Sequence, residues 1–262
     1  AAVQADGRIV VAGYGEDPAG TSPYLVLARY RPDGALDPTF GDGGVVTTTL
    51  ADDPRSMARA NDVAVARDGS IVAVGYVAVP ETNDWAVARF RADGSPDLGF
   101  GDAGLARVSL GDGTFEEASA VTLAPGGGIA LVGYHEASWN LARLRADGML
   151  DPRFGDGGTV RSIAFGDPGD IVADAHGNLV VTGRTAPTGS YDATVMRFRR
   201  DGRPDRRFGT DGVVTTDLAG GTEDAAAVAL QPDGAIVIAG SSDPDPPDPE
   251  TWTDVLVARY HR

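Results

Sequence analysis

The sequence predicts an all-β protein made of one unit that is repeated five times along 262 residues. A segment resembling DGxIVVAGY is followed by LARYRxDG and DPxFGDGG, and this order recurs through the chain. The Gly that opens the first apolar run of each unit also precedes a second Gly by six residues. These pairs are Gly7 and Gly13, Gly69 and Gly75, Gly127 and Gly133, Gly177 and Gly183, and Gly234 and Gly240. Repeats of roughly 40 to 60 residues with several short strands are typical of β-propeller blades.

Each unit contains four expected strands, which we name a, b, c and d in chain order. In the second unit they are the segments NDVAVA, SIVAVGY, DWAVARF and GLARVSL between residues 61 and 110. A pair such as Asp68-Gly69 ends strand a and predicts a two-residue hairpin turn, and a pair such as Asp93-Gly94 ends strand c. Such short turns predict antiparallel neighbours. Because both faces of the strands are partly apolar, we expect sheets that are covered on both sides.

We therefore predict a five-bladed β-propeller of four-stranded antiparallel blades that forms a single domain over residues 1–262. The last blade is incomplete, because the fifth unit ends after its strand c at Tyr260 and no strand d follows. Either this blade has three strands or the chain is a fragment of a longer protein. The expected repeats span about 1–55, 56–114, 115–165, 166–219 and 220–262.

The composition argues against several classes of partner and site. The formal net charge of −16 disfavours nucleic acid and anionic membranes as partners. No segment approaches the roughly 20 apolar residues of a membrane span. The chain has no Cys, which excludes disulfides and zinc–thiolate sites, and all 22 of its basic residues are Arg, which excludes lysine chemistry. We expect no membrane insertion, and we expect a monomer.

The recurring segments resemble the bacterial delta-60 repeat family. The matching pieces are QPDGAIVIAG at 231–240, LARYRPDG at 27–34 and LDPTFGDGG at 36–44, and they recur in the same order over nearly the whole chain. The resemblance implies a propeller-like repeat domain of the kind found in large, often exported bacterial proteins. It implies an extracellular or cell-surface location in a bacterium and no particular reaction.

Three residue types recur at fixed places and are interpreted as structural. An Arg in strand c precedes an Asp by eight residues, and a buried guanidinium needs such a carboxylate partner. A Phe in each connection between strands c and d predicts an aromatic plug between neighbouring blades. These residues are Arg29, Arg89, Arg143 and Arg197; Asp37, Asp97, Asp151 and Asp205; and Phe40, Phe100, Phe154 and Phe208. The fifth Arg, Arg259, lacks the Asp and is expected to have no partner within the chain.

The b–c and d–a connections vary in length and composition, so we expect any ligand site at their end of the sheets. Each d–a connection carries two acidic residues, which form a solvated acidic rim, a cation site for Ca²⁺, or a recess for a positively charged ligand. They are Asp52 and Asp53, Glu116 and Glu117, Asp167 and Asp170, and Glu223 and Asp224. One aromatic residue near the start of each strand c either packs at a blade edge or binds carbohydrate. These are Tyr24, Trp85, Trp139, Tyr191 and Trp252.

The sequence therefore predicts a non-catalytic binding or protein-interaction scaffold whose ligand is a protein or a carbohydrate. The chain has no GxSxG motif and no paired His, which argues against the common hydrolytic sites and against cofactors other than Ca²⁺. Two alternatives stay open. The first is a propeller lyase or hydrolase that uses carboxylates at the mouth of the axial channel. The second is a structural spacer within a longer repeat protein.

Overall fold

The computed structural model of this protein describes residues 1–16, 23–48, 57–79, 82–111, 116–186, 190–218, 220–243 and 253–261. These residues form eighteen β-strands. No helix in this described part of the chain is long and apolar enough to cross a membrane. The chain divides into two compact units, Ala1–Leu123 with Leu144–Met149, and Ala124–Arg143 with Leu150–Arg262.

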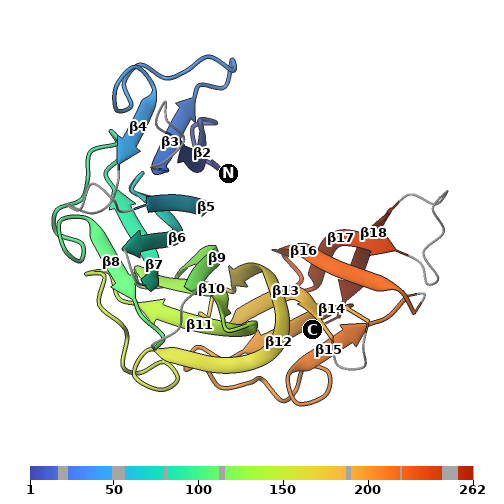
Figure 1. Cartoon of the computed structure of the whole chain (residues 1–262). Coiled ribbons are helices and arrows are strands. Elements are labelled where there is room, and N and C mark those ends of the chain that lie inside the picture. The colour runs from blue at the N-terminus through green and yellow to red at the C-terminus, as the bar shows by residue number, and fades with distance from the viewer. Residues whose placement is uncertain are drawn as a thin grey trace. The chain divides into compact units, whose positions relative to one another are not determined.

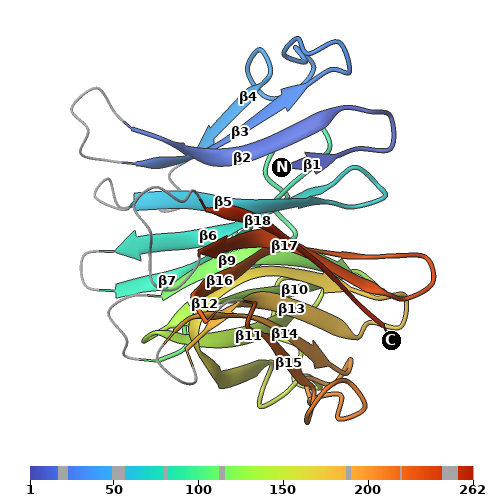
Figure 2. The ribbon, with the colours of Figure 1, turned by 90° about the vertical axis from the view of Figure 1, so that its right-hand side faces the viewer.

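The first unit contains two antiparallel four-stranded sheets, each formed by one repeat (Figure 1). The first sheet consists of β1 (Ala2–Val3), β2 (Ile9–Gly15), β3 (Tyr24–Tyr30) and β4 (Val45–Thr48), in that spatial order. The second sheet consists of β5 (Met57–Val65), β6 (Ile71–Val79), β7 (Thr82–Phe90) and β8 (Leu105–Val108), also in order. The a–b turns of the two sheets, 4–8 and 66–70, lie at the same end of the strands (Figure 2). Strand β9 (Glu116–Ala124) follows, and all but its last residue belongs to this unit.

The second unit contains a larger sheet, with the order β15-β14-β13-β12-β11-β10, and a three-stranded sheet, with the order β16-β17-β18. The strands of the larger sheet are β10 (Gly128–His135), β11 (Ser138–Leu144), β12 (Thr159–Ala173), β13 (Leu179–Thr185), β14 (Asp192–Phe198) and β15 (Val213–Thr216). Those of the smaller sheet are β16 (Thr222–Leu230), β17 (Ile236–Asp243) and β18 (Asp254–Tyr260).

Strand β12 joins two repeats without the loop that the sequence suggests. Its first half pairs with β11 and its second half, from Gly166 to Ala173, pairs with β13. The pairing partner changes from β11 to β13 at Gly166, whose φ is +135°. A side chain there would overlap the carbonyl oxygen of Arg184, so only Gly allows the strand to continue.

Four of the five a–b turns differ from the expected two-residue hairpin; in the third repeat Gly126 and Gly127 both have the positive φ that such a hairpin requires. The N–H of Gly7 donates to the carbonyl of Gln4, and the N–H of Gln4 donates to the carbonyl of Arg8. Gly7 has a φ of +83°, whereas the preceding Asp6 is not among the residues with positive φ. The loop therefore has three residues and closes on a left-handed Gly. The same hydrogen bonds recur at Gly69, Gly177 and Gly234.

Consecutive sheets within each unit pack face to face in the same way. In the first unit Leu25 and Leu27 of β3 belong to one buried cluster with Ile71 of β6. In the second unit Val195 of β14 belongs to one buried cluster with Ile238 of β17. Because strand c of one repeat faces strand b of the next, each repeat buries the apolar face of its neighbour, as propeller blades do.

Candidate functional site

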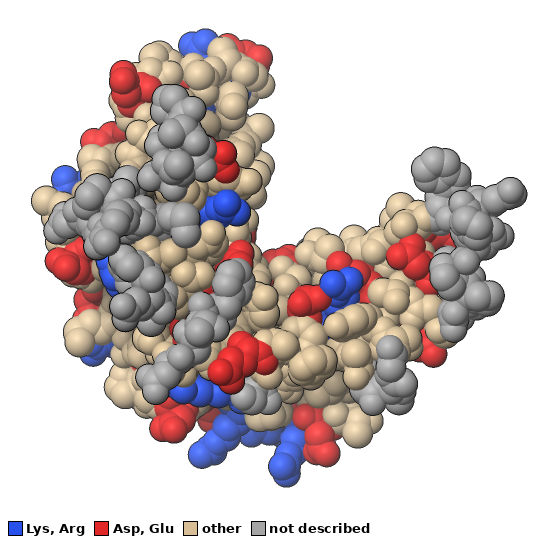
Figure 3. Space-filling view, in the orientation of Figure 1, with Lys and Arg blue, Asp and Glu red and all other residues tan. Residues whose placement is uncertain are grey.

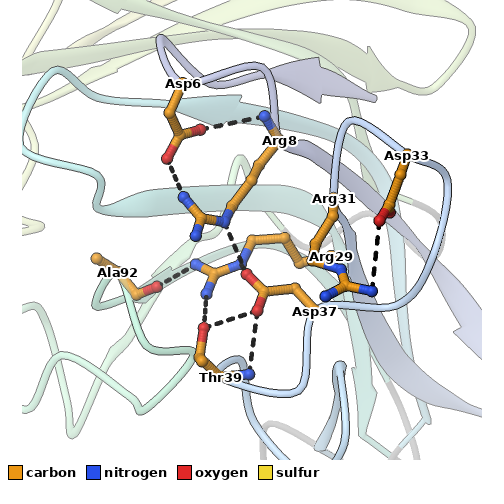
Figure 4. Close-up of polar contacts among 8 residues, drawn as sticks. All are labelled: Asp6, Arg8, Arg29, Arg31, Asp33, Asp37, Thr39 and Ala92. Atoms are coloured by element: carbon orange, nitrogen blue, oxygen red, sulfur yellow. Dashed lines mark hydrogen bonds and ion pairs between the residues drawn. The ribbon is translucent and has the colours of Figure 1, made fainter.

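One end of the sheets is held together by Arg–Asp pairs, which Figure 4 shows for the first repeat. Nε of Arg29 donates to Oδ2 of Asp37 at 2.8 Å, and Nη1 of Arg29 donates to the carbonyl of Ala92 in the next repeat at 2.5 Å. Arg8 donates to the same Asp37 oxygen at 2.8 Å, and Thr39 donates to the other oxygen. Asp37 is only 2% exposed. These contacts connect two sheets and occupy both carboxylate oxygens of Asp37, so this residue is not available to a ligand.

The same ion pair occurs at all four positions where the Arg and the Asp recur. The N–O distances are 2.8 Å for Arg29–Asp37, 2.6 Å for Arg89–Asp97, 3.5 Å for Arg143–Asp151 and 3.4 Å for Arg197–Asp205. The expectation that Arg259 lacks a partner is wrong. Its Nη2 lies 2.6 Å from Oδ2 of Asp233, and its Nε donates to Oε1 of Gln231 at 2.7 Å. Arg259 thus pairs with the a–b turn of its own repeat.

The recurring Phe residues are buried. Phe40, Phe100 and Phe154 are fully buried, and Phe208 is 5% exposed. The guanidinium of Arg29 lies 4.6 Å above the Phe40 ring, and that of Arg89 lies 4.7 Å above the Phe100 ring. The Phe40 and Phe100 rings therefore pack under a cation as well as against the neighbouring repeat.

The Asp37 pair predicts a specific loss of stability in acid. The hydrogen bond from Thr39, together with Arg29 and Arg8, lowers the pKa of Asp37 to about 2. Because the unfolded value is near 3.9, the pair stabilises the fold above about pH 4 and loses this contribution as the pH falls toward 2. We expect Asp37→Asn to remove that part of the acid dependence of the urea midpoint between pH 5 and pH 2.5. Asp33→Asn, a change at an exposed turn residue, should keep the wild-type dependence, and equal behaviour of the two variants would contradict the prediction.

The opposite end of the sheets carries the acidic residues that the sequence suggests as cation ligands. Four of the six that are described have the following protein donors, and burial raises the pKa of another, Asp224. The Leu110 N–H donates to both carboxylate oxygens of Glu116, at 3.1 and 2.9 Å. Asn61 donates to Glu117 at 2.6 Å. Asp167 pairs with Arg184, and Asp170 accepts from the N–H of Val228 at 2.9 Å. Asp52 and Asp53 lie outside the described residues.

Glu223 differs from these residues because it lies beside Asp192 and Asp217, two acidic residues that are not among the expected cation ligands. One carboxylate oxygen of Glu223, one of Asp192 and one of Asp217 lie within 4.8 Å of one another. We name these three residues the acidic cluster. Asp192 begins β14, Asp217 directly follows β15, and Glu223 is the second residue of β16. The N–H of Glu223 donates to the carbonyl of Tyr191 at 2.7 Å, which holds the start of β16 beside the start of β14.

Two of the three residues of the acidic cluster are buried, and none of the three forms an ion pair with a described cation. Glu223 is fully buried and Asp192 is 6% exposed, whereas Asp217 is exposed. Ser242 donates to Oε1 of Glu223 at 3.0 Å, but Oε2 of Glu223 and Oδ1 of Asp192 are buried without a described hydrogen-bond partner. Burial, and then the charge of Asp217, raises the pKa of Asp192. Buried carboxylates that lack donors are costly unless a proton or a cation joins them.

The five aromatic residues do not form equivalent pockets. Trp85 and Trp139 are fully buried, which contradicts a sugar-binding role for their indoles. Trp139 lies over Gly183, where a side chain would meet its ring at 2.7 Å. Tyr24 lies five residues before Arg29, whereas Trp85 lies four residues before Arg89. Because side chains alternate along a strand, the two aromatic side chains point to opposite faces. Trp252 lies outside the described residues.

Strand register could have identified Asp192 and Asp217 from the sequence. Ala193 of β14 pairs with Thr216 of β15. In an antiparallel pair the next residues outward, Asp192 and Asp217, must then lie opposite each other. Asp192 lies at the start of strand c, outside the d–a connections in which we expected the cation ligands.

Comparison with known proteins supports the fold. Residues 4–40, 66–100 and 132–154, which lie in the first three repeats and make up less than half of the chain, match the family described as domain of unknown function (DUF5122) beta-propeller. No curated protein sequence matches the chain.

Solved structures with a similar fold include a protein of unknown function from Dyadobacter fermentans, which is 14% identical. The match covers 97% of this chain and 76% of that one, with a TM-score of 0.52. The PQQ-bound aldose sugar dehydrogenase of Streptomyces coelicolor is 11% identical over 97% of this chain and 86% of that one, with a TM-score of 0.48. The calcium-binding protein regucalcin of Agrobacterium tumefaciens is 14% identical over 91% and 84%, with a TM-score of 0.39. The chain is thus an all-β protein of antiparallel, propeller-like repeats, similar to the DUF5122 beta-propeller family.

Proposed function

We propose that the protein is a non-catalytic binding module of a bacterial exported or surface protein. In this proposal it has five blades of the delta-60 type, the last with three strands, and it acts as a monomer. Its ligand, a protein or a carbohydrate, binds at the end of the sheets formed by the b–c and d–a connections. The acidic cluster at that end holds a Ca²⁺ ion. The observation that carries the proposal is the pair of buried carboxylate oxygens, on Glu223 and Asp192, without a described donor.

The spacing of the acidic cluster suits Ca²⁺. Calcium–oxygen bonds are about 2.4 Å long, so two ligands of one ion lie at most about 4.8 Å apart. The oxygens of Asp192, Asp217 and Glu223 fall within this limit. Magnesium bonds of about 2.1 Å reach only about 4.2 Å and demand a stricter octahedral geometry. Water can supply further ligands on the side of Asp217, because that residue is exposed.

Calcium should raise the thermal stability of the protein. At 100 times its dissociation constant, a bound ion adds about 2.7 kcal/mol to the free energy of unfolding, or roughly 5 to 10 °C in a chain of this size. We expect this shift between CaCl₂ and EDTA in differential scanning calorimetry at pH 7. The shift should be smaller at pH 5, because the raised pKa of Asp192 lets protons compete with the ion.

Matched variants test whether the ion binds at the acidic cluster. Glu223→Gln and Asp192→Asn should each abolish most of the calcium shift. Glu116→Gln is the control, because Glu116 occupies the same place in its repeat but accepts a hydrogen bond from Leu110. It should leave the shift intact even if it alters the basal melting temperature. A calcium shift that survives Glu223→Gln, or no shift in the wild type, would refute the proposed site.

A hydrolase or lyase is the second candidate, favoured by the raised pKa of Asp192 beside a second carboxylate. A buried acid of this kind can donate a proton to a leaving group. Hydrolysis or elimination that Asp192→Asn abolishes in EDTA would favour the enzyme. Calcium-dependent stabilisation with no turnover of glycoside and polysaccharide substrates would favour the binding module.

A further inference from the structure

The connection between β14 and β15 is far more basic than its equivalents. Residues 197–207 contain six Arg and two Asp, whereas residues 29–39 and 89–99 each contain two Arg and two Asp. Residues 143–153 contain three Arg and two Asp. In a chain with a net charge of −16, this local excess of positive charge is the exception. Blue side chains gather along the lower edge of Figure 3, where Figure 1 shows the yellow and orange loops.

Part of this connection lines a cavity in the second unit. The cavity has a volume of about 540 Å³ and is lined by Asn178, Arg197, Arg199, Asp205 and Arg207. We name it the Arg pocket. Three guanidinium groups face one carboxylate in its lining, so the pocket has an excess of positive charge. It lies at the end of the sheets that carries the Arg–Asp pairs, and it is therefore separate from the acidic cluster.

The guanidinium groups of the Arg pocket are incompletely paired. Nε of Arg197 is buried without a hydrogen-bond partner, and its nearest carboxylates, those of Asp205 and Asp174, are 3.4 and 3.7 Å away. The corresponding N–O distance is 2.8 Å for Arg29–Asp37 and 3.5 Å for Arg143–Asp151, where Nε of Arg143 is also buried without a hydrogen-bond partner. Arg199 approaches Asp205 only at 3.9 Å and is half exposed. The exposed side chain of Arg207 forms no ion pair with the described residues. The exposed guanidinium groups of Arg199 and Arg207 are therefore available to an anionic ligand.

We propose that the Arg pocket binds the phosphate or sulfate group of a ligand. Arg presents a planar fork of N–H donors that matches oxyanions in bidentate fashion. A carboxylate offers only two oxygens, whereas a tetrahedral phosphate or sulfate offers up to four, enough for three Arg side chains. The group enters as a monoester, because the cavity is larger than a single oxyanion. The first and second repeats have equal numbers of Arg and Asp in the equivalent segment, so we expect no oxyanion binding there.

Titration calorimetry at low ionic strength tests this site, with sodium phosphate and sodium sulfate as probes. We expect saturable binding of at least one ion with a stoichiometry of one. The double variant Arg199→Ala/Arg207→Ala should weaken it at least tenfold. Both side chains are solvent-accessible, so this variant should keep the wild-type melting temperature. Arg31→Ala is the matched control, since Arg31 is the equivalent of Arg199 in the first repeat and is 46% exposed. It should leave binding unchanged.

Competition with glucose 6-phosphate and glucose 6-sulfate then separates the two sources of the oxyanion. Displacement of the bound ion by the phosphate ester assigns the pocket to phosphorylated ligands, and displacement by the sulfate ester assigns it to sulfated ones. Displacement by neither ester would overturn the proposal. So would the absence of saturable binding, or an equal loss of affinity in Arg31→Ala and in the double variant.

Discussion

Replacing Phe100 by Ala should lower the free energy of unfolding by about 3 to 5 kcal/mol, the range measured for large aromatic side chains in well-packed cores. Phe100 is fully buried, and the Arg89 guanidinium lies 4.7 Å above its ring. Its far side packs against the next repeat, since a side chain on Gly148 would meet the Phe100 ring at 3.2 Å. Substitution therefore creates a cavity beneath a charged group and between two repeats. Urea-induced unfolding followed by circular dichroism measures the change.

A second Phe provides the control for this experiment. Phe165 in β12 is 60% exposed. Phe165→Ala should change the free energy of unfolding by less than about 1 kcal/mol, because an exposed side chain leaves no cavity. If the two variants lost similar stability, the recurring Phe would not be the plug between repeats.

Replacing Gly75 by Ala should cost about 3 kcal/mol or more, at the upper end of the range for overpacking. A side chain there would overlap the carbonyl oxygen of Arg59, and this contact is with backbone that cannot rotate away. The close approach occurs beside a β-bulge, where the pairing of β5 with β6 shifts between Ala60 and Asp62. The second Gly of the repeat is thus required by the approach of strand a, and thermal unfolding should show the loss directly.

Gly13 occupies the same place in the first repeat and tests this explanation. A side chain on Gly13 would meet no atom within 4 Å. Gly13→Ala should therefore be neutral or stabilise the fold by up to about 1 kcal/mol, by restricting the unfolded chain. A large loss of stability in Gly13→Ala would mean that the Gly serves a conformational need common to all repeats instead.

The repeat register predicted the sheets because the turns and strands recur in the same order, with fixed spacing within the a–b hairpin and within the c–d connection. It did not predict the continuous strand β12, because the change there depends on one Gly and on a backbone contact with Arg184. The register also did not reveal the partner of Arg259. This Arg pairs with Asp233 of the a–b turn, whereas the other strand-c Arg residues pair with an Asp of the c–d connection. Local spacing describes what the repeats share, and these contacts arise where one repeat departs from the others.

The candidate site was only partly predictable for a related reason. The sequence shows Glu223 as an acidic residue in a variable connection, but it shows Glu116 and Glu117 in the same way. The carboxylates of these two residues accept hydrogen bonds from Leu110 and Asn61. Only the three-dimensional structure shows which carboxylate has donors and which does not. The alternation of side chains along a strand explains why the five aromatic residues do not form equivalent pockets. Trp85 lies an even number of residues from its strand-c Arg and Tyr24 an odd number, so alternation along the strand places the two side chains on opposite faces.

The most direct test of the calcium site is a crystal structure of the protein grown with CaCl₂, with anomalous data collected at long wavelength. We predict one calcium peak at 2.3 to 2.6 Å from carboxylate oxygens of Asp192, Asp217 and Glu223. An anomalous map with no peak at these residues, although the crystal contains calcium, would contradict the account.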